Sequence, residues 1–305
     1  MTDGTGDSGS PFPGSAYPLG ANPSFADLVR AVSLPAVTAS TPAAASVSVP
    51  HGTTVLALRY DGGVVMAGDR RAVEGFSIAD ERIEKVFPAD EYSSVAIAGA
   101  AGQATEIVRL FQTELEHYEK VEGDRLSLEG KANRLAQMIR GNFGMALQGL
   151  AVVPLFAGYD LRRSEGRIYR YDVTGGRWEE ADYHATGSGG VHARGSLKKR
   201  WRSGLDRDSA IRAAVEALYD ASQEDVATGG PNILRGVFPS VKVVDAAGVQ
   251  VVGDDELRGI VESILGEAMD ASKPVSASPA REIQEPPEAS AGGADPGEAG
   301  HRGGA

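Results

Sequence analysis

The sequence lacks cysteine, lacks long apolar runs and carries a deficit of positive charge. Without thiols, a disulfide framework, thiolate zinc sites and a cysteine nucleophile are all excluded. No stretch approaches the roughly 20 apolar residues that a membrane-spanning helix needs. The formal net charge of −12 argues against binding to nucleic acid or anionic lipid, since both depend on concentrated positive charge. The short basic run at residues 198–202 is more typical of a solvated helix face or a subunit contact.

The N-terminal residues bear on the cellular location of the protein, and the histidines bear on metal binding. The first residues are acidic and polar, whereas a secretory signal has a positive start followed by an apolar run. Together with the absence of cysteine, this favours a cytoplasmic location. Neither a metal nor a cofactor is expected, because the histidines lack the spacing of metal ligands; they are His51, His117, His184, His192 and His301.

Composition divides the chain into three parts. Residues 1–52 are rich in Gly, Pro, Ser, Ala and Thr, a composition that cannot bury enough apolar surface to offset the entropy of ordering. Within this segment, apolar residues at 25, 28, 29 and 32 predict a short amphipathic helix. Residues 53–269 carry dense secondary-structure signals and are expected to form one domain, and residues 270–305 are predicted to be a disordered tail.

Residues 53–269 predict alternating blocks of strands and helices. Turn signals and β-type composition predict strands at residues 53–60, 64–68, 83–87, 93–99, 151–159, 167–173, 177–181, 240–245 and 249–252, and a further strand that ends at residues 185–187. Helical periodicity predicts helices at residues 102–120, 128–148, 190–199, 208–224 and 254–269. Because helix pairs alternate with mainly antiparallel strands, we expect an α+β fold of four layers, αββα, with two sheets face to face between helices.

A distinctive junction, His51-Gly52-Thr53-Thr54-Val55, lies where the low-complexity segment meets the first strand. Five segments follow in order: TTVLALRYDGGVVMAGDRRA, RIEKVF, VAIAGAAG, ATGSGG and EDVATGG. Over most of residues 53–267 the sequence resembles proteasome β-subunits of the bacterial, actinobacterial type, which are N-terminal-nucleophile hydrolases. The resemblance implies a threonine endopeptidase that is made as a precursor and cuts itself between Gly52 and Thr53.

The resemblance assigns the nucleophile and its two charged partners to three residues. Thr53 matches the family's nucleophile, whose own freed amine serves as the base. Such an amine has a reference pKa of about 7.7 to 8.0, so a sizeable neutral fraction exists near pH 7. Lys85 matches the lysine whose charge lowers the pKa of that amine, and Asp69 matches the aspartate that keeps this lysine charged and oriented.

Four further residues match supporting positions. Gly99 matches the position whose backbone N–H stabilises the tetrahedral oxyanion. Ser188 and Asp225 match a pair beside the threonine amine, and Thr228 stands where the family usually has serine, with the hydroxyl retained. At the junction, Gly52 is expected because scission requires a strained backbone and glycine reaches conformations that other residues avoid.

Substrate contacts follow from the same matching. Arg71, Ala72 and Val73 are expected to pair with an extended peptide as an added strand. The primary specificity pocket is expected to be apolar and to favour hydrophobic residues before the cut. Its expected lining residues are Ala72, Ile83, Ile97 and Ala101, with Phe87 and Thr105 as further candidates.

The resemblance also implies an assembly. Proteins of this family form seven-membered β-rings capped by α-rings in a four-ring barrel, and a ring-shaped ATPase feeds them unfolded proteins that carry a small protein tag. The first 52 residues would keep Thr53 blocked until the rings meet. Neither nucleic acid nor a membrane is expected as a partner.

Three alternatives stay open. A simpler bacterial ring protease related to proteasomes also begins with Thr-Thr, but the long precursor segment counts against it. A catalytically silent ring subunit would be expected to lack Thr53, Asp69 or Lys85, and all three are present. Another self-processing amidohydrolase would place its nucleophile deeper in the chain, behind a folded precursor domain.

Overall fold

The computed structural model describes residues 52–271. The helix expected at residues 25–32, the remainder of segment 1–51 and residues 272–305 of the expected tail lie outside the described residues. The last helix runs to Ala271, two residues beyond the end predicted for the domain. Within residues 52–271, no helix has the length and apolar character needed to cross a membrane.

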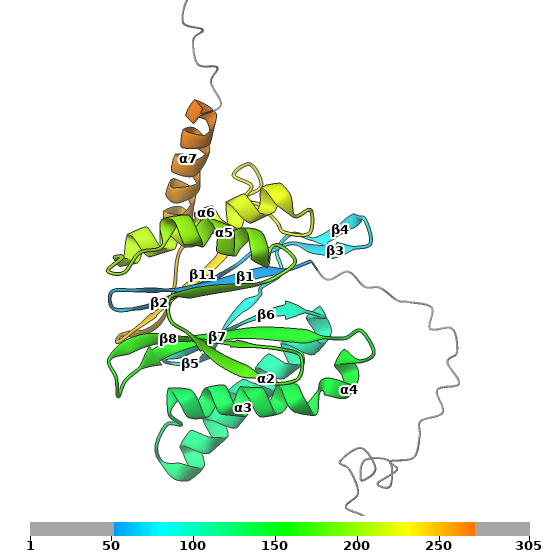
Figure 1. Ribbon diagram of the computed structural model, residues 1–305, viewed down its shortest axis with the longest axis vertical. Coiled ribbons are helices and arrows are strands. Elements are labelled where there is room, and N and C mark those ends of the chain that lie inside the picture. The colour runs from blue at the N-terminus through cyan, green and yellow to red at the C-terminus, as the bar shows by residue number, and fades with distance from the viewer. Residues whose placement is uncertain (1–51, 272–305) are drawn as a thin grey trace, which may run out of the picture. The chain divides into compact units, whose positions relative to one another are not determined.

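Two five-stranded antiparallel sheets form the centre of the described part (Figure 1). The first sheet has the order β10-β1-β2-β11-β12, with β10 (Tyr183–Gly187), β1 (Thr54–Tyr60), β2 (Gly63–Gly68), β11 (Ser240–Asp245) and β12 (Gly248–Val251). The second sheet has the order β5-β6-β7-β8-β9, with β5 (Val86–Asp90), β6 (Ser93–Gly99), β7 (Val152–Asp160), β8 (Glu165–Tyr171) and β9 (Arg177–Glu180). The central hairpin β1–β2 is thus flanked by strands that come more than 100 residues later.

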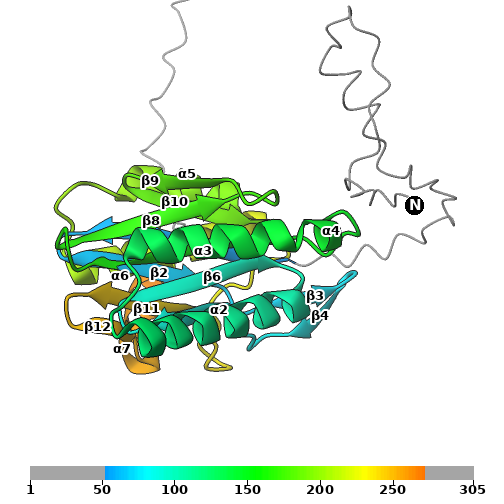
Figure 2. The same ribbon diagram turned by 90° about the horizontal axis from the view of Figure 1, so that it is seen from below.

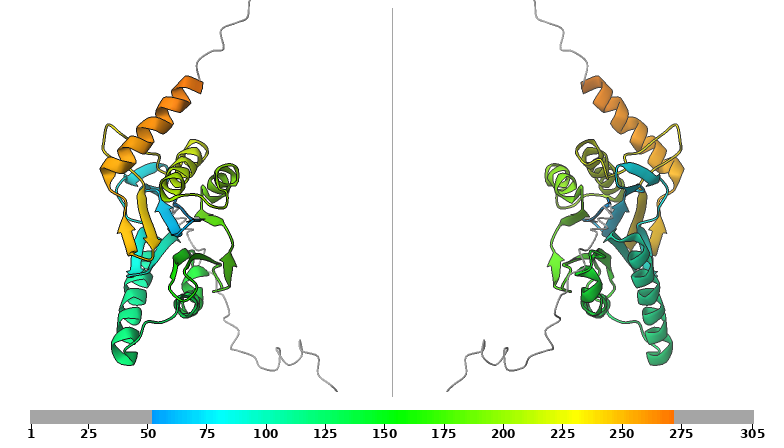
Figure 3. Two further views of the ribbon diagram at one scale, coloured as in Figure 1. Left: turned by 90° about the vertical axis from the view of Figure 1, so that its left-hand side faces the viewer. Right: turned by 90° about the vertical axis from the view of Figure 1, so that its right-hand side faces the viewer.

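Helices cover the outer faces of both sheets, as Figures 2 and 3 show from below and from the two sides. The second sheet is covered by α2 (Ala101–Glu122) and α3 (Leu128–Gly141), and the short α4 (Phe143–Ala146) follows α3. The first sheet is covered by α5 (Gly190–Arg200) and α6 (Arg207–Glu224), and α7 (Asp254–Ala271) packs into the same cluster of apolar side chains. The expected αββα order is therefore confirmed.

Strand β1 shows how the sequence produces these layers. Its side chains point alternately to opposite faces of the sheet. Leu56 and Leu58 enter the cluster under α5 and α6, whereas Val55 and Ala57 enter the cluster between the two sheets. Because both faces are buried, β1 reads as a nearly continuous apolar run rather than as an alternating one.

Three local features differ from the sequence prediction. The strand predicted at 83–87 begins only at Val86, so Lys85 precedes β5. The helix predicted at 128–148 is interrupted at Asn142, whose side-chain amide donates to the carbonyl of Met138 (2.9 Å) and so occupies an acceptor at the end of α3. A hairpin of β3 (Ala72–Glu74) and β4 (Ser77–Asp80) was not predicted, because it is largely exposed and lacks apolar alternation.

Strands β2 and β8 approach closely enough to require glycine. A Cβ atom on Gly166 would lie 2.4 Å from the carbonyl carbon and oxygen of Gly63. We expect Gly166→Ala to lower the free energy of unfolding by about 1–3 kcal/mol, because the sheets must move apart. The measurement is the midpoint of urea-induced unfolding. Gly195→Ala is the control: Gly195 faces open space in α5, and alanine there should stabilise by up to about 1 kcal/mol. Equal midpoints for wild type and Gly166→Ala would contradict the steric account.

Candidate active site

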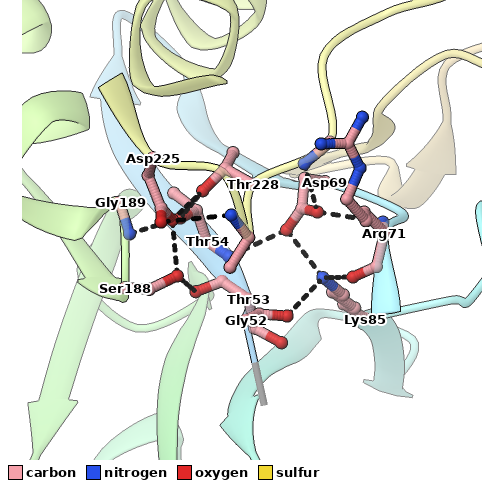
Figure 4. Close-up of polar contacts among 12 residues, drawn as sticks. Gly52, Thr53, Thr54, Asp69, Arg71, Lys85, Ser188, Gly189, Asp225 and Thr228 are labelled. Carbon is pink, nitrogen blue, oxygen red and sulfur yellow. Dashed lines mark hydrogen bonds and ion pairs between the residues drawn. The ribbon is translucent and has the colours of Figure 1, made fainter. Parts of the chain in front are cut away.

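The carboxylate of Asp69 is fully buried immediately after β2 and accepts four hydrogen bonds (Figure 4). Its Oδ1 atom accepts from the backbone N–H of Thr54 (2.8 Å) and from the Lys85 ammonium (2.7 Å). Its Oδ2 atom accepts from the backbone N–H groups of Arg71 and Gly229, each at 2.9 Å. A buried charge needs such complete satisfaction to be tolerated. The predicted Asp69–Lys85 pair is therefore present in the structure.

The ammonium group of Lys85 is likewise buried and has three acceptors. Besides Asp69 Oδ1, it donates to the carbonyl oxygens of Arg71 (2.6 Å) and Gly52 (3.4 Å). Burial lowers the pKa of Lys85, and the adjacent Asp69 charge opposes that shift. The contact with Gly52 places a positive charge at the carbonyl of the Gly52–Thr53 peptide bond.

A second polar cluster surrounds Asp225. Its Oδ2 atom accepts from the hydroxyls of Ser188 and Thr228, each at 2.5 Å, and its Oδ1 atom accepts from Ala227 N (3.2 Å). Burial alone would raise the pKa of Asp225, but the hydrogen bonds from Ser188 and Thr228 outweigh burial and lower it. The backbone N–H of Ser188 donates to the Thr53 carbonyl (2.9 Å). Asp225 is thus an ionised carboxylate, and Ser188 links it to the Thr53 carbonyl.

The structure explains Gly99 through its backbone. Gly99 has a φ of +129°, and a Cβ atom there would lie 2.2 Å from the carbonyl oxygen of Ala151. Across the β5 edge of β6, Ile97 N donates to Lys85 O (3.1 Å). Backbone N–H groups alternate along a strand, so Gly99 presents its N–H to that same edge, just beyond the start of β5. Gly99 also lines the pocket that contains Thr53.

A cavity of about 60 Å³ opens beside Thr53. Of the predicted substrate residues, it is lined by Arg71, Ala72, Val73, Ile83, Ile97, Phe87 and Thr105. Ala101 begins α2, and its side chain lies outside the described part of the structure. Two lining residues were not predicted from the sequence, Glu84 and Ala104. A helical stripe containing position 104 could have indicated Ala104, whereas no sequence signal distinguishes Glu84.

Gly52 packs tightly against the 225–230 loop. A Cβ atom on Gly52 would lie 2.0 Å from the Cβ atom of Ala227. Close packing therefore requires glycine at this position, and the strained backbone expected from the sequence stays a prediction.

Two face-to-face antiparallel sheets between helix layers, with a threonine leading into β1 beside a buried lysine and aspartate, define the class of N-terminal-nucleophile hydrolases. Comparison with known proteins identifies the family within this class. Residues 49–234 match the family model described as "Proteasome subunit".

Two relatives named proteasome subunit beta are each 60% identical to this chain. The one from Acidimicrobium ferrooxidans aligns over 238 residues, 78% of this chain and 87% of its own length. The one from Acidothermus cellulolyticus aligns over 225 residues, 72% of this chain and 78% of its own length. The chain belongs to the proteasome subunit family. It is of the β type, a threonine-type endopeptidase of the 20S core that assembles with α-subunits. The family resemblance inferred from the junction and its five segments is thus confirmed.

Replacing Asp69 with asparagine tests whether the buried carboxylate holds the site together. Whichever way the amide is turned, its NH₂ group faces two N–H donors, and Lys85 loses its counter-charge. We expect Asp69→Asn to destabilise the protein by about 3–5 kcal/mol in urea unfolding.

The matched control is Glu165→Gln. Glu165 pairs with Arg59 at 2.8 Å, but both side chains are about one third exposed (35% and 31%). We expect this substitution to cost no more than about 1 kcal/mol. Similar losses of unfolding free energy in Asp69→Asn and Glu165→Gln would show that burial does not strengthen the contribution of the Asp69–Lys85 pair.

Proposed function

We propose that the chain activates itself by cutting the peptide bond between Gly52 and Thr53, which makes residues 1–52 a propeptide and residues 53–269 the catalytic domain. The observation that carries this proposal is the buried Lys85–Asp69 pair, whose ammonium donates to the Gly52 carbonyl (3.4 Å). A positive charge at this oxygen stabilises the negative charge that develops when the carbonyl is attacked.

Self-cleavage proceeds by attack of the Thr53 hydroxyl on the Gly52 carbonyl carbon. A C–O bond forms, the C–N bond breaks, and the hydroxyl proton ends on the nitrogen, which becomes the free amine of Thr53. Water then hydrolyses the resulting ester, giving a Gly52 carboxylate and restoring the hydroxyl. Tight packing of Gly52 against Ala227 holds the bond in place for this attack.

After cleavage, the new amine serves as the general base for peptide hydrolysis. It accepts the proton of the Thr53 hydroxyl as oxygen attacks the substrate carbonyl, and it passes that proton to the departing amine. The positive charge of Lys85 lowers the pKa of this amine and favours its neutral form, while Asp69 keeps Lys85 charged. Ser188 and Asp225 orient the amine from the other side.

Two backbone features complete the catalytic arrangement. The N–H of Gly99, directed to the β5 edge, stabilises the oxyanion of the tetrahedral intermediate. In the β3–β4 hairpin, β3 pairs with β4 on one side only, so the opposite edge at Arg71, Ala72 and Val73 can pair with an extended substrate. The largely apolar cavity beside Thr53 then receives the substrate side chain before the cut.

The finer assembly belongs to the same proposal. Seven copies of this chain would form each β-ring of a four-ring barrel in the cytoplasm. A ring-shaped ATPase would act through the α-rings and deliver unfolded, tagged proteins. Enclosure inside a barrel suits a site that accepts an extended substrate and has an apolar pocket beside its nucleophile.

Replacing Thr53 tests self-cleavage and catalysis together. When the chain is coexpressed with its α-subunit, intact mass and N-terminal sequencing should find a new terminus at Thr53. Thr53→Ala should abolish this terminus and peptidase activity, because the attacking hydroxyl is lost. Thr53→Ser keeps a hydroxyl and should retain both at a reduced rate. A processed terminus in Thr53→Ala would refute the mechanism.

Filling the cavity tests the specificity pocket separately. Ala104→Val adds two methyl groups at a buried lining position. We expect kcat/KM to fall about 10-fold or more for peptides with a large apolar residue before the cut. Peptides with alanine there should be little affected, and self-cleavage should persist because Gly52 has no side chain to accommodate. Equal losses for both kinds of peptide would contradict a role of this cavity in specificity.

A further inference from the structure

Thr54, the first residue of β1, connects the two polar clusters of the site. Its side chain is fully buried. Its backbone N–H donates to Asp69 Oδ1 (2.8 Å), on the side of the lysine–aspartate pair. Its hydroxyl accepts from Gly189 N (2.9 Å) and lies 2.6 Å from the hydroxyl oxygen of Thr228. In Figure 4, Thr54 accordingly lies between Asp69 and the Asp225 cluster.

The direction of the hydrogen bonds in this cluster can be assigned from its composition. The carboxylate of Asp225 only accepts, so the single hydroxyl proton of Thr228 is donated to Asp225 Oδ2 (2.5 Å). Thr228 therefore cannot also donate to Thr54. The hydroxyl of Thr54 must donate to Thr228, which gives a directed chain from Thr54 through Thr228 to Asp225.

Gly189 leaves room for this pair of hydroxyls. A Cβ atom on Gly189 would lie 2.6 Å from both the Thr54 and the Thr228 hydroxyl oxygens. Its backbone N–H supplies the second hydrogen bond of Thr54. Both hydroxyls are thus satisfied in a buried setting where an unpaired hydroxyl would be costly.

The peptide unit between Thr53 and Thr54 is also held at both ends. Its carbonyl oxygen accepts from Ser188 N (2.9 Å), and its N–H donates to Asp69 (2.8 Å). Once the chain is cut before Thr53, Thr54 becomes the only covalent neighbour of the terminal residue. The orientation of the new amine then depends on how firmly Thr54 is held.

We propose that the Thr54 hydroxyl is a positioning group that fixes Thr53 between the Lys85–Asp69 pair and the Asp225 cluster. This inference rests on the proposed role of Thr53. Thr54 acts through its neighbours and does not touch the reacting atoms. The side chain serves twice: its β-branch restricts χ1, and its hydroxyl joins the chain to Asp225.

A crossed pair of substitutions separates the hydroxyl from its packing. Thr54→Val keeps the shape and loses the hydroxyl, whereas Thr54→Ser keeps the hydroxyl and loses a methyl group. Both are tested in the full chain assembled with α-subunits, with assembly checked by size-exclusion chromatography. The readouts are the rate of self-cleavage, kcat and KM separately, and the pH profile of kcat/KM.

We expect Thr54→Val to slow self-cleavage and to lower kcat about 10- to 100-fold with little change in KM, because the nucleophile is misplaced. The acid limb of its pH profile should move to higher pH, since a less well hydrogen-bonded Asp225 cluster raises the pKa of the nearby amine. Thr54→Ser should restore kcat to within a few fold of wild type. If Thr54→Val fails to assemble, Thr54→Ala carries the same comparison with Thr54→Ser.

Two results would overturn the proposal. One is wild-type kcat and pH profile in Thr54→Val, and the other is a Thr54→Ser variant as impaired as Thr54→Val, which indicates packing alone. The Thr53→Ala variant is run alongside. If Thr53→Ala still matures, the role of Thr53 fails; if Thr53→Ala is inactive while Thr54→Val is normal, only the role of Thr54 fails.

Discussion

The buried carboxylate of Asp69 is the interaction on which the site depends. Its four hydrogen bonds come from the start of β1, the approach to β3, the loop at Gly229 and the side chain of Lys85. The most distant of these donors, the Gly229 N–H, lies 160 residues from Asp69 in the sequence. A carboxylate that is shielded from water is costly if any of its hydrogen-bond donors is missing. The four segments that supply these donors are therefore held in one relative arrangement. The geometry at Thr53 follows from that arrangement.

Sequence patterns predicted the fold where burial determines the pattern. Strands such as β1 and β6 lie with both faces in apolar clusters, and their composition alone distinguishes them. The β3–β4 hairpin has the opposite character. Its tip residue Phe76 is fully exposed and Ile78 is half exposed, so no burial pattern marked it. The sequence predicts a strand at residues 83–85, but the structure has none there. Lys85 instead donates its side chain to Asp69 and its backbone N–H to Glu84, and hydrophobic periodicity carries no signal for either hydrogen bond.

The same distinction applies within the site. Thr53, Asp69 and Lys85 lie within 33 residues of one another and could be recognised from a motif. The contacts of Thr54 with Gly189 and Thr228 span 135 and 174 residues, and spacing alone gives no sign of them. The Thr53-Thr54 pair at the junction was the single local signal for a second hydroxyl. The Thr54 hydroxyl gains its hydrogen-bond partners only when folding brings the Ser188 and Asp225 loops to the start of β1.

The two polar clusters differ in chemistry in a way that suits the proposed base, the Thr53 amine that self-cleavage would create. One cluster holds the Lys85 charge against a buried carboxylate and beside the carbonyl of the Gly52–Thr53 peptide bond. The other consists of hydroxyls around a half-buried carboxylate, and hydroxyls can donate or accept as the amine changes its protonation. Before cleavage the nitrogen of Thr53 is an amide and cannot act as a base. Both clusters are nevertheless already formed in the uncut chain, and under the proposed cleavage the amine would appear between them.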